Sequence, residues 1–161
     1  MLLALSISAI LVVACVLIHY EVLRFASLLL SRLTISPRRR ILVVMAAVFF
    51  AHAIEIWMYA AAYFLATGYV GLGSLSGTLE NNFSDYLYFS TSTYSSLGYG
   101  DINPLGNLRI MAGIETVTGL VMIGWSASFT YLAMEKFWGL HGPRKEYAAC
   151  RRDLSVFCVQ E

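Results

Sequence analysis

The sequence predicts an all-α membrane protein with three transmembrane helices, on the strength of its composition and of three long apolar runs. Hydrophobic residues make up 58% of the 161 residues and charged residues only 13%, a composition that fits a soluble fold poorly. The apolar runs cover residues 1–18, 41–67 and 110–134, and their only Asp, Glu, Lys or Arg residues are Glu55 and Glu115. Because about 20 helical residues cross the hydrocarbon core of a bilayer, each run has the length of one span.

The placement of the basic residues predicts how these spans are oriented. Of the 11 Lys and Arg residues, five lie in residues 19–40 and five in residues 135–161. The segment between the second and third runs carries Glu80, Asp85 and Asp101 instead. Lys and Arg favour the cytoplasmic side of a membrane. We therefore expect the N-terminus outside, the first basic segment inside, the acidic segment outside and the C-terminus in the cytoplasm.

Residues 1–36 are expected to form an extra N-terminal unit. A span over about residues 2–18 is followed by an amphipathic continuation toward residue 33, which we expect to lie at the cytoplasmic interface. No basic segment precedes the apolar run and the residues after Cys15 stay apolar, so a retained span is favoured over a cleaved signal peptide. The three cysteines are too scattered for a disulfide framework or a metal site.

The second span is expected to begin at Ser36 and Pro37, a capping residue followed by a proline that suits the first helical turn. It is expected to end near residue 67. Four glycines in residues 68–82 then indicate an exposed loop on the outer side.

A short aromatic helix is expected from Phe83 to about residue 95, with Ser84 or Asp85 as its N-cap, and it is too short to cross a bilayer. The polar, glycine-bearing stretch of residues 93–101 follows it. Such irregular backbone is tolerated at membrane depth only where protein or a water-filled pore surrounds it. The two glycines that flank Tyr99 accept positive φ without steric cost. They can therefore alternate the hand of the backbone and turn successive carbonyl oxygens toward a cation.

This stretch resembles the selectivity filter of the potassium channel family, a Thr-Val-Gly-Tyr-Gly loop whose carbonyl oxygens replace the hydration shell of potassium. Ser96 takes the position of the threonine and Leu97 that of the valine. The next four residues match unchanged: Gly98, Tyr99, Gly100 and Asp101. The resemblance implies an ion-binding filter over residues 96–100, with K⁺ bound at Ser96, Leu97, Gly98 and Tyr99.

The same resemblance implies the architecture. Residues 37–138 correspond to the pore domain of the family, with an outer helix, a re-entrant pore helix, the filter and an inner helix. Residues 139–161 would form a short cytoplasmic tail, and the extra helix of residues 1–36 would pack at the periphery. A single loop cannot encircle an ion, so the resemblance implies a homotetramer.

Several further residues receive roles from the resemblance. Asp101 would hold the filter at its outer mouth through hydrogen bonds to the pore helix, with Ser95 and Tyr88 as further support. Gly119 and Gly124 are candidates for a hinge in the inner helix.

One histidine and two glutamates lie within the predicted spans: His52, Glu55 and Glu115. His52 and Glu55 are three residues apart and therefore share a helix face. An ionised carboxylate in mid-membrane is costly, so these groups must face protein or water, have partners or carry a proton. Two interpretations stay open: a proton-sensitive network behind the pore that modulates gating, or a buried pair that fixes helix packing.

Two departures from the family pattern bear on selectivity. Ser96 keeps the hydroxyl of threonine but lacks its methyl group, and Leu97 is not β-branched. We expect a passive, potassium-preferring cation channel, with a weakly selective sodium and potassium channel as the alternative. A non-conducting subunit that regulates other channels is a further alternative. A proton-coupled transporter would need paired broken spans, which the sequence lacks.

The expected partners are three more copies of the chain and the lipid bilayer, with other channel subunits left open and no nucleic acid. No enzyme motif is visible, and no cofactor is expected besides K⁺ as the permeant ion. A small chain with one pore loop and no regulatory domain is typical of bacterial channels, which predicts the inner membrane.

Overall fold

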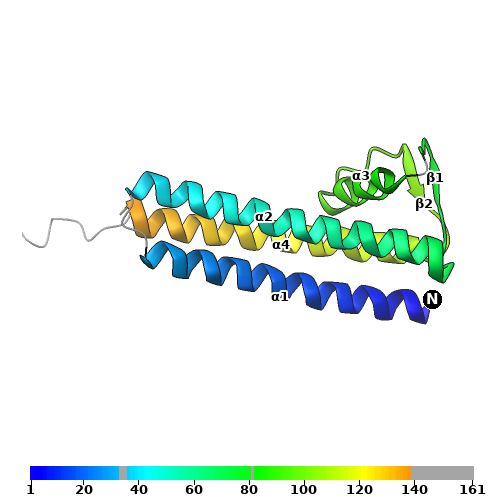
Figure 1. Cartoon of the computed structure of the whole chain (residues 1–161), viewed down its shortest axis with the longest axis horizontal. Coiled ribbons are helices and arrows are strands. Elements are labelled where there is room, and N and C mark those ends of the chain that lie inside the picture. Colours follow the sequence, from blue (N-terminus) through cyan, green and yellow to red (C-terminus); the bar gives the residue numbers. More distant parts are fainter. Residues whose placement is uncertain (33–35, 81, 139–161) are drawn as a thin grey trace, which may run out of the picture.

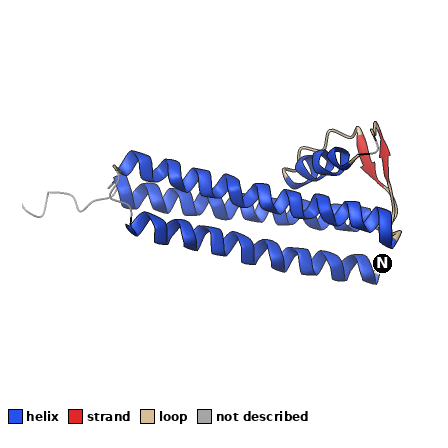
Figure 2. Cartoon of the chain, viewed as in Figure 1, coloured by secondary structure: helices blue, strands red, loops and turns tan. Residues whose placement is uncertain are grey.

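The computed structural model describes residues 1–32, 36–80 and 82–138, and the tail predicted for residues 139–161 lies outside this range. Three long helices lie side by side, and a short helix and a two-stranded sheet pack at one end of them (Figure 1). The elements in chain order are α1 (Leu2–Arg32), α2 (Pro37–Leu65), the π-helical turn η1 (Ala66–Val70), β1 (Leu75–Gly77), α3 (Phe83–Tyr94), β2 (Ile102–Pro104) and α4 (Leu108–Trp138). Figure 2 shows how little of the described chain is loop.

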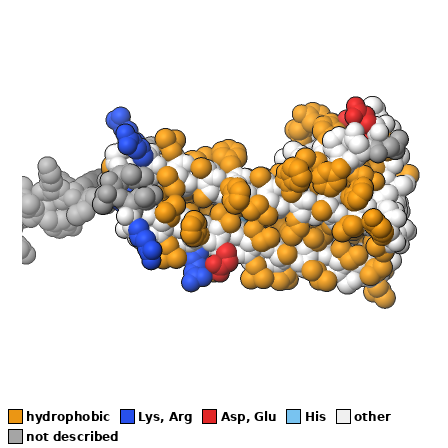
Figure 3. Space-filling view, in the orientation of Figure 1, with side chains coloured by type: hydrophobic (Ala, Val, Ile, Leu, Met, Phe, Trp, Pro, Cys, Tyr) orange, Lys and Arg blue, Asp and Glu red, His pale blue; other side chains and the backbone are white. Residues whose placement is uncertain are grey.

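The three long helices confirm the predicted spans. α1 and α4 have 31 residues each and α2 has 29. At 1.5 Å per residue each helix is about 45 Å long, which exceeds the hydrocarbon core of about 30 Å. All three have the apolar composition of a membrane span. Hydrophobic side chains cover the length of the bundle in Figure 3, and Lys and Arg gather toward the end opposite α3. The chain is a multi-pass membrane protein.

α1 is one unbroken helix that runs along both α2 and α4. Its second half, expected at the cytoplasmic interface, packs as part of the bundle, since Leu23, Ala26 and Leu30 are buried. These residues recur at spacings of three and four and so form one stripe along the helix. Burial of this stripe therefore places residues 19–32 beside the other two helices.

α2 begins at Pro37 as predicted, after the extended residue Ser36, although the Ser36 side chain makes no capping hydrogen bond. The α-helix ends at Leu65 and continues as the π-helical turn η1. Gly71, with a φ of 64°, then stops the helix in the left-handed conformation that glycine favours. The predicted end near residue 67 falls inside this turn.

α3 confirms the predicted short helix, but its N-cap is Asn82 rather than Ser84 or Asp85. The Asn82 side chain accepts a hydrogen bond from the N–H of Ser84 at 2.9 Å. Asp85 lies in the first turn and accepts a hydrogen bond from the N–H of Asn82 at 3.4 Å. The two side chains form a capping box, which satisfies free N–H groups at the helix start reciprocally.

The loop predicted for residues 68–82 contains the short strand β1. It pairs with β2 in an antiparallel register that places Gly77 opposite Ile102. Gly77 has a φ of 124°, and a Cβ atom there would lie 1.9 Å from the backbone oxygen of Asp101. Only glycine permits this approach. The sheet therefore fastens the outer loop to the chain just after the predicted filter.

A buried cluster holds α3 against α2 and α4. Tyr63 of α2 and Phe89 of α3 meet edge to face, with ring centroids 5.1 Å apart. Leu108 and Met111 at the start of α4 are fully buried in the same cluster. An edge-to-face aromatic pair contributes about 0.5–1.5 kcal/mol beyond its buried area. This packing determines where α3 ends and thereby where the following loop starts.

Candidate functional site

Residues 95–101, called the filter loop below, leave the C-terminal end of α3 and lead into β2. Ser96, Gly98 and Gly100 have positive φ angles of 57°, 54° and 81°, whereas the residues between them do not. When the φ angles of successive residues alternate in sign, the N–H groups point to one side of the chain and the carbonyl oxygens to the other. The backbone therefore has the alternating form that the two glycines predict.

The carbonyl oxygens of the filter loop are available for a ligand. Among the residues that the structure describes, no N–H or hydroxyl group donates to the carbonyl oxygens of residues 96–99. The N–H side is used instead, since the N–H of Leu97 donates to the oxygen of Ser92 at 2.9 Å. The side-chain amide of Asn103 donates to the oxygen of Gly100 at 2.8 Å. Hydrogen bonds thus hold the loop from both ends and leave four consecutive oxygens free.

Tyr88 of α3 holds the end of the filter loop that leads into β2. Its hydroxyl donates to the Asp101 carboxylate at 2.9 Å, and its ring stacks on that of Tyr99 with centroids 6.2 Å apart. The hydrogen bond to Asp101 raises the pKa of Tyr88 above its ordinary value of 10.0. The bond is therefore fully present at neutral pH and is lost only as the pH rises through the raised pKa.

The two serines at the start of the loop have different surroundings. Ser95 is the first residue of the loop, and its Oγ donates back to the backbone oxygen of Thr91 at 2.8 Å, so it closes the end of α3. Ser96 borders a cavity of about 260 Å³ between the filter loop, α3 and α4, together with Thr93 and Thr116. Ser95 thus supports the filter loop only through the helix that precedes it.

α4 approaches the last turn of α3 at Gly119. A Cβ atom at this position would lie 2.1 Å from the backbone oxygen of Tyr94 and 2.9 Å from its carbonyl carbon. At Gly124 a Cβ atom would meet nothing within 4 Å, and α4 is unbroken through both glycines. Gly119 therefore has a packing role beside the filter loop that its spacing does not reveal. A hinge at either glycine stays a prediction.

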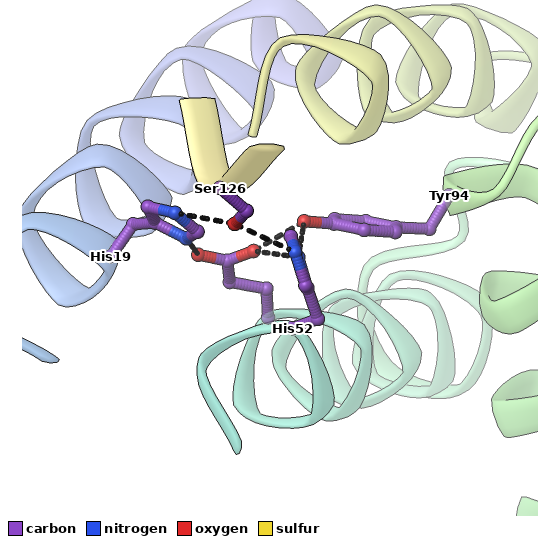
Figure 4. Close-up of polar contacts among 5 residues, drawn as sticks. His19, His52, Tyr94 and Ser126 are labelled. Carbon is purple, nitrogen blue, oxygen red and sulfur yellow. Dashed lines mark hydrogen bonds and ion pairs between the residues drawn. The ribbon is translucent and has the colours of Figure 1, made fainter. Parts of the chain in front are cut away.

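A closed ring of hydrogen bonds joins all four α-helices next to the filter loop (Figure 4). His19 Nδ1 lies 2.9 Å from Glu55 Oε1, and the Tyr94 hydroxyl donates to Glu55 Oε2. His52 Nδ1 lies 2.8 Å from the Tyr94 hydroxyl. Ser126 Oγ closes the ring, 3.0 Å from His52 Nε2 and 3.1 Å from His19 Nε2. These five residues are called the polar ring below.

The sequence predicts only part of the polar ring. His52 and Glu55 share a helix face as expected, with His52 Nδ1 3.4 Å from Glu55 Oε2. His19, Tyr94 and Ser126 are members that sequence reasoning missed. The available signal for His19 is a histidine directly after an apolar run. No local pattern singles out Ser126.

Glu115 does not belong to the polar ring, which corrects the expectation of one network with His52 and Glu55. One of its oxygens accepts a hydrogen bond from Tyr63 of α2 at 2.5 Å, and the other lies 2.6 Å from Ser90 Oγ of α3. A buried carboxyl group is tolerated when both oxygens have partners. Glu115 thus forms a second buried polar link between α2, α3 and α4.

The polar ring also contains the donor types of a metal site. His19, His52 and Glu55 offer ligand atoms that lie within 4.8 Å of one another. Both nitrogens of each histidine and both oxygens of Glu55 already have hydrogen-bond partners inside the ring. The ring is complete without an ion, so we interpret it as a hydrogen-bonded element.

Comparison with known proteins identifies the family of this chain. A family model described as an ion channel matches residues 40–136, more than half of the chain, from the first turn of α2 to near the end of α4. No curated protein and no solved structure matches the chain. The matched part contains the filter loop and leaves α1 outside. The chain belongs to the ion channel family and is not an enzyme.

Proposed function

We propose that the chain is the pore subunit of a passive, potassium-preferring channel in which four copies bring their filter loops to one axis. The observation that carries this proposal is the set of four free carbonyl oxygens at residues 96–99, on a backbone of alternating hand. Four loops would supply rings of oxygens that replace the water around a K⁺ ion. The ion would pass in single file, without a cofactor.

Two exposed side chains support assembly around the filter loop. Leu97 and Tyr99 are 57% and 66% exposed in the single chain. In a closed ring of subunits, large side chains of this kind are covered by neighbouring copies. α3 ends where the loop begins. The partially negative C-terminal ends of four such helices would favour a cation in the cavity below the filter.

We place the filter loop on the outer side of a bacterial inner membrane. Arg38, Arg39 and Arg40 begin α2 and Lys136 lies in the last turn of α4, so these charges lie at the end of the bundle opposite the filter loop. Lys and Arg favour the cytoplasmic side. Asp101 would then form an acidic ring at the outer mouth and raise the local concentration of cations.

Ser96 and Leu97 favour a second candidate, a weakly selective channel for sodium and potassium. Serine lacks the methyl group that restricts threonine, and leucine lacks the β-branch of valine, so the loop is held less rigidly. Reversal potentials with potassium on one side and sodium on the other separate the two candidates. A large shift from zero supports potassium preference, and a value near zero supports the weakly selective channel.

Ion flux into liposomes tests the proposed function. Purified wild-type protein should carry potassium into liposomes, and the Gly98→Ala variant should not. A purified chain that carries no ion flux, yet copurifies with another channel subunit, would contradict the proposal. That outcome would favour a non-conducting regulatory subunit.

The Tyr88→Phe variant tests how the outer end of the filter loop is held. It removes the hydrogen bond to Asp101 and keeps the ring that stacks on Tyr99. We expect a folded channel with a higher ratio of sodium to potassium permeability, measured from bi-ionic reversal potentials. An unchanged ratio would mean that the sheet alone holds Asp101.

The His52→Gln variant tests whether the polar ring senses protons. Glutamine keeps one donor and one acceptor but does not titrate. We expect the variant to flatten any pH dependence of the wild-type current. Identical profiles would assign His52 a purely structural role.

A further inference from the structure

We propose that His19 is a positioning residue for the filter loop, because it closes the polar ring that holds Tyr94. His19 lies on α1, the helix outside the residues that the ion channel family model matches. The inference rests on the proposed function, since it concerns the same filter loop. It makes α1 a functional part of the pore rather than the peripheral addition that the sequence predicts.

Tyr94 connects the polar ring to the filter loop. It is the last residue of α3, and the loop begins at the next residue. Its hydroxyl contacts both Glu55 and His52, while its backbone oxygen is packed against Gly119 of α4. Because Tyr94 is held at its side chain and at its backbone, the start of the filter loop has little freedom of position.

His19 completes the ring from outside the pore fold. Without it, Glu55 Oε1 and Ser126 Oγ would each lose a hydrogen-bond partner. Glu55 is fully buried and Ser126 nearly so, and an unpaired polar group in such a place is costly. Glu55 would then be free to rotate away from Tyr94. Loss of His19 on α1 therefore reaches Tyr94 through one intermediate side chain, that of Glu55, and the filter loop begins at the next residue.

The proton content of the ring explains why every member matters. Each hydroxyl, each neutral imidazole and a protonated carboxyl group can donate one hydrogen bond and accept one. Five such groups supply five protons for the five contacts of the ring. An ionised Glu55 with one doubly protonated histidine supplies the same number. Each contact of the ring therefore has a proton of its own, and removal of any member leaves two contacts unmade.

Three further titratable groups interact with ring members through electrostatics alone: Cys15 of α1 and Glu115 of α4 with Tyr94, and Tyr59 of α2 with Glu55. Within the described residues, no hydrogen bond joins any of the three to a ring member. Trp125 of α4 covers the His19 ring, with centroids 5.2 Å apart. The hydrogen bonds of the five ring members therefore form a self-contained set.

Three variants of the full chain in liposomes test the proposal. His19→Leu opens the ring from α1, and Ser126→Ala opens it from α4. Leu23→Ala is the matched control, because it removes a buried side chain from α1 one turn further on and none of the five hydrogen bonds of the ring. Each ring variant removes two hydrogen bonds. We expect each to raise the ratio of sodium to potassium permeability by about two- to tenfold or more, since a single lost hydrogen bond corresponds to that range. Leu23→Ala should keep the wild-type ratio.

Two further measurements separate positioning from packing. Because His19→Leu and Ser126→Ala open the same ring, the double variant should raise the ratio by less than the product of the single effects. His19→Gln keeps one donor and one acceptor, so it should keep the wild-type ratio where His19→Leu does not.

A His19→Leu protein that assembles and keeps the wild-type ratio overturns the proposal. If His19→Leu does not assemble, a wild-type ratio in Ser126→Ala overturns it instead. The proposed function fails separately. If the wild-type chain carries no potassium, the function and this inference both fall. Suppose instead that the wild-type chain conducts potassium and Gly98→Ala does not. If the ring variants then have the wild-type permeability ratio, only this inference falls.

Discussion

The Gly119→Ala variant is expected to assemble poorly and to lose most of its potassium conduction. A methyl group at this position would lie 2.1 Å from the backbone oxygen of Tyr94, well inside the usual contact distance of about 3.5 Å. The obstacle is backbone and cannot rotate aside, so α4 and the end of α3 must separate. Overpacking of this kind costs about 1–3 kcal/mol and sometimes more. The displaced residue also holds the polar ring, so the start of the filter loop shifts with it.

Gly124→Ala is the matched control for Gly119→Ala. It makes the same chemical change in the same helix, at a position where a Cβ atom meets nothing within 4 Å. Alanine favours a helix over glycine by about 0.8–1.0 kcal/mol, so this variant should be at least as stable as the wild type. The measurements are the tetramer fraction in detergent, the thermal stability and the potassium flux. Normal assembly of Gly119→Ala with altered gating alone would support a hinge instead.

Gly98→Ala is expected to abolish potassium flux in a protein that still assembles. Gly98 has a φ of 54° and open space around it, so the cost of a side chain is conformational rather than steric crowding. A left-handed L-residue costs about 1–2 kcal/mol. Because that cost would arise in each of the four copies of the proposed tetramer, we expect a fall in flux on the order of a hundredfold or more. Flux into liposomes and the tetramer fraction measure the two parts of this prediction.

Gly68→Ala is the control for Gly98→Ala. Gly68 lies in η1, has no positive φ, and offers open space to a Cβ atom. The same methyl group at this position should therefore leave flux and assembly unchanged. Wild-type flux in Gly98→Ala would contradict a filter built from the backbone of this loop.

The membrane class and the form of the filter loop could be predicted because both depend on contiguous residues. Three apolar runs of span length account for α1, α2 and α4. Gly98 and Gly100 predict alternating backbone, and both have positive φ in the structure. Ser96 also has a positive φ. Its residue type does not predict this, because a serine normally avoids positive φ.

The N-cap of α3 and the strand β1 could not be predicted from the sequence. Three neighbouring residues are equally good caps, and the strand is too short to leave a pattern. Asn82, Ser84 and Asp85 are all good capping residues, and only the path of the preceding loop selects Asn82. β1 has three residues, which is too few to show the alternation of a strand. It forms only because it pairs with β2, which follows α3 in the chain.

The local sequence was sufficient for three spans and a glycine-bearing loop, since hydropathy and backbone freedom are properties of neighbouring residues. The polar ring required the packed helices: His19 lies 36 positions before Glu55 and 107 before Ser126, yet all three share one buried set of hydrogen bonds. The same packing separates Glu115 from that set and places Gly119 against Tyr94. Helix packing brings these residues together, and their spacing along the chain does not predict these contacts.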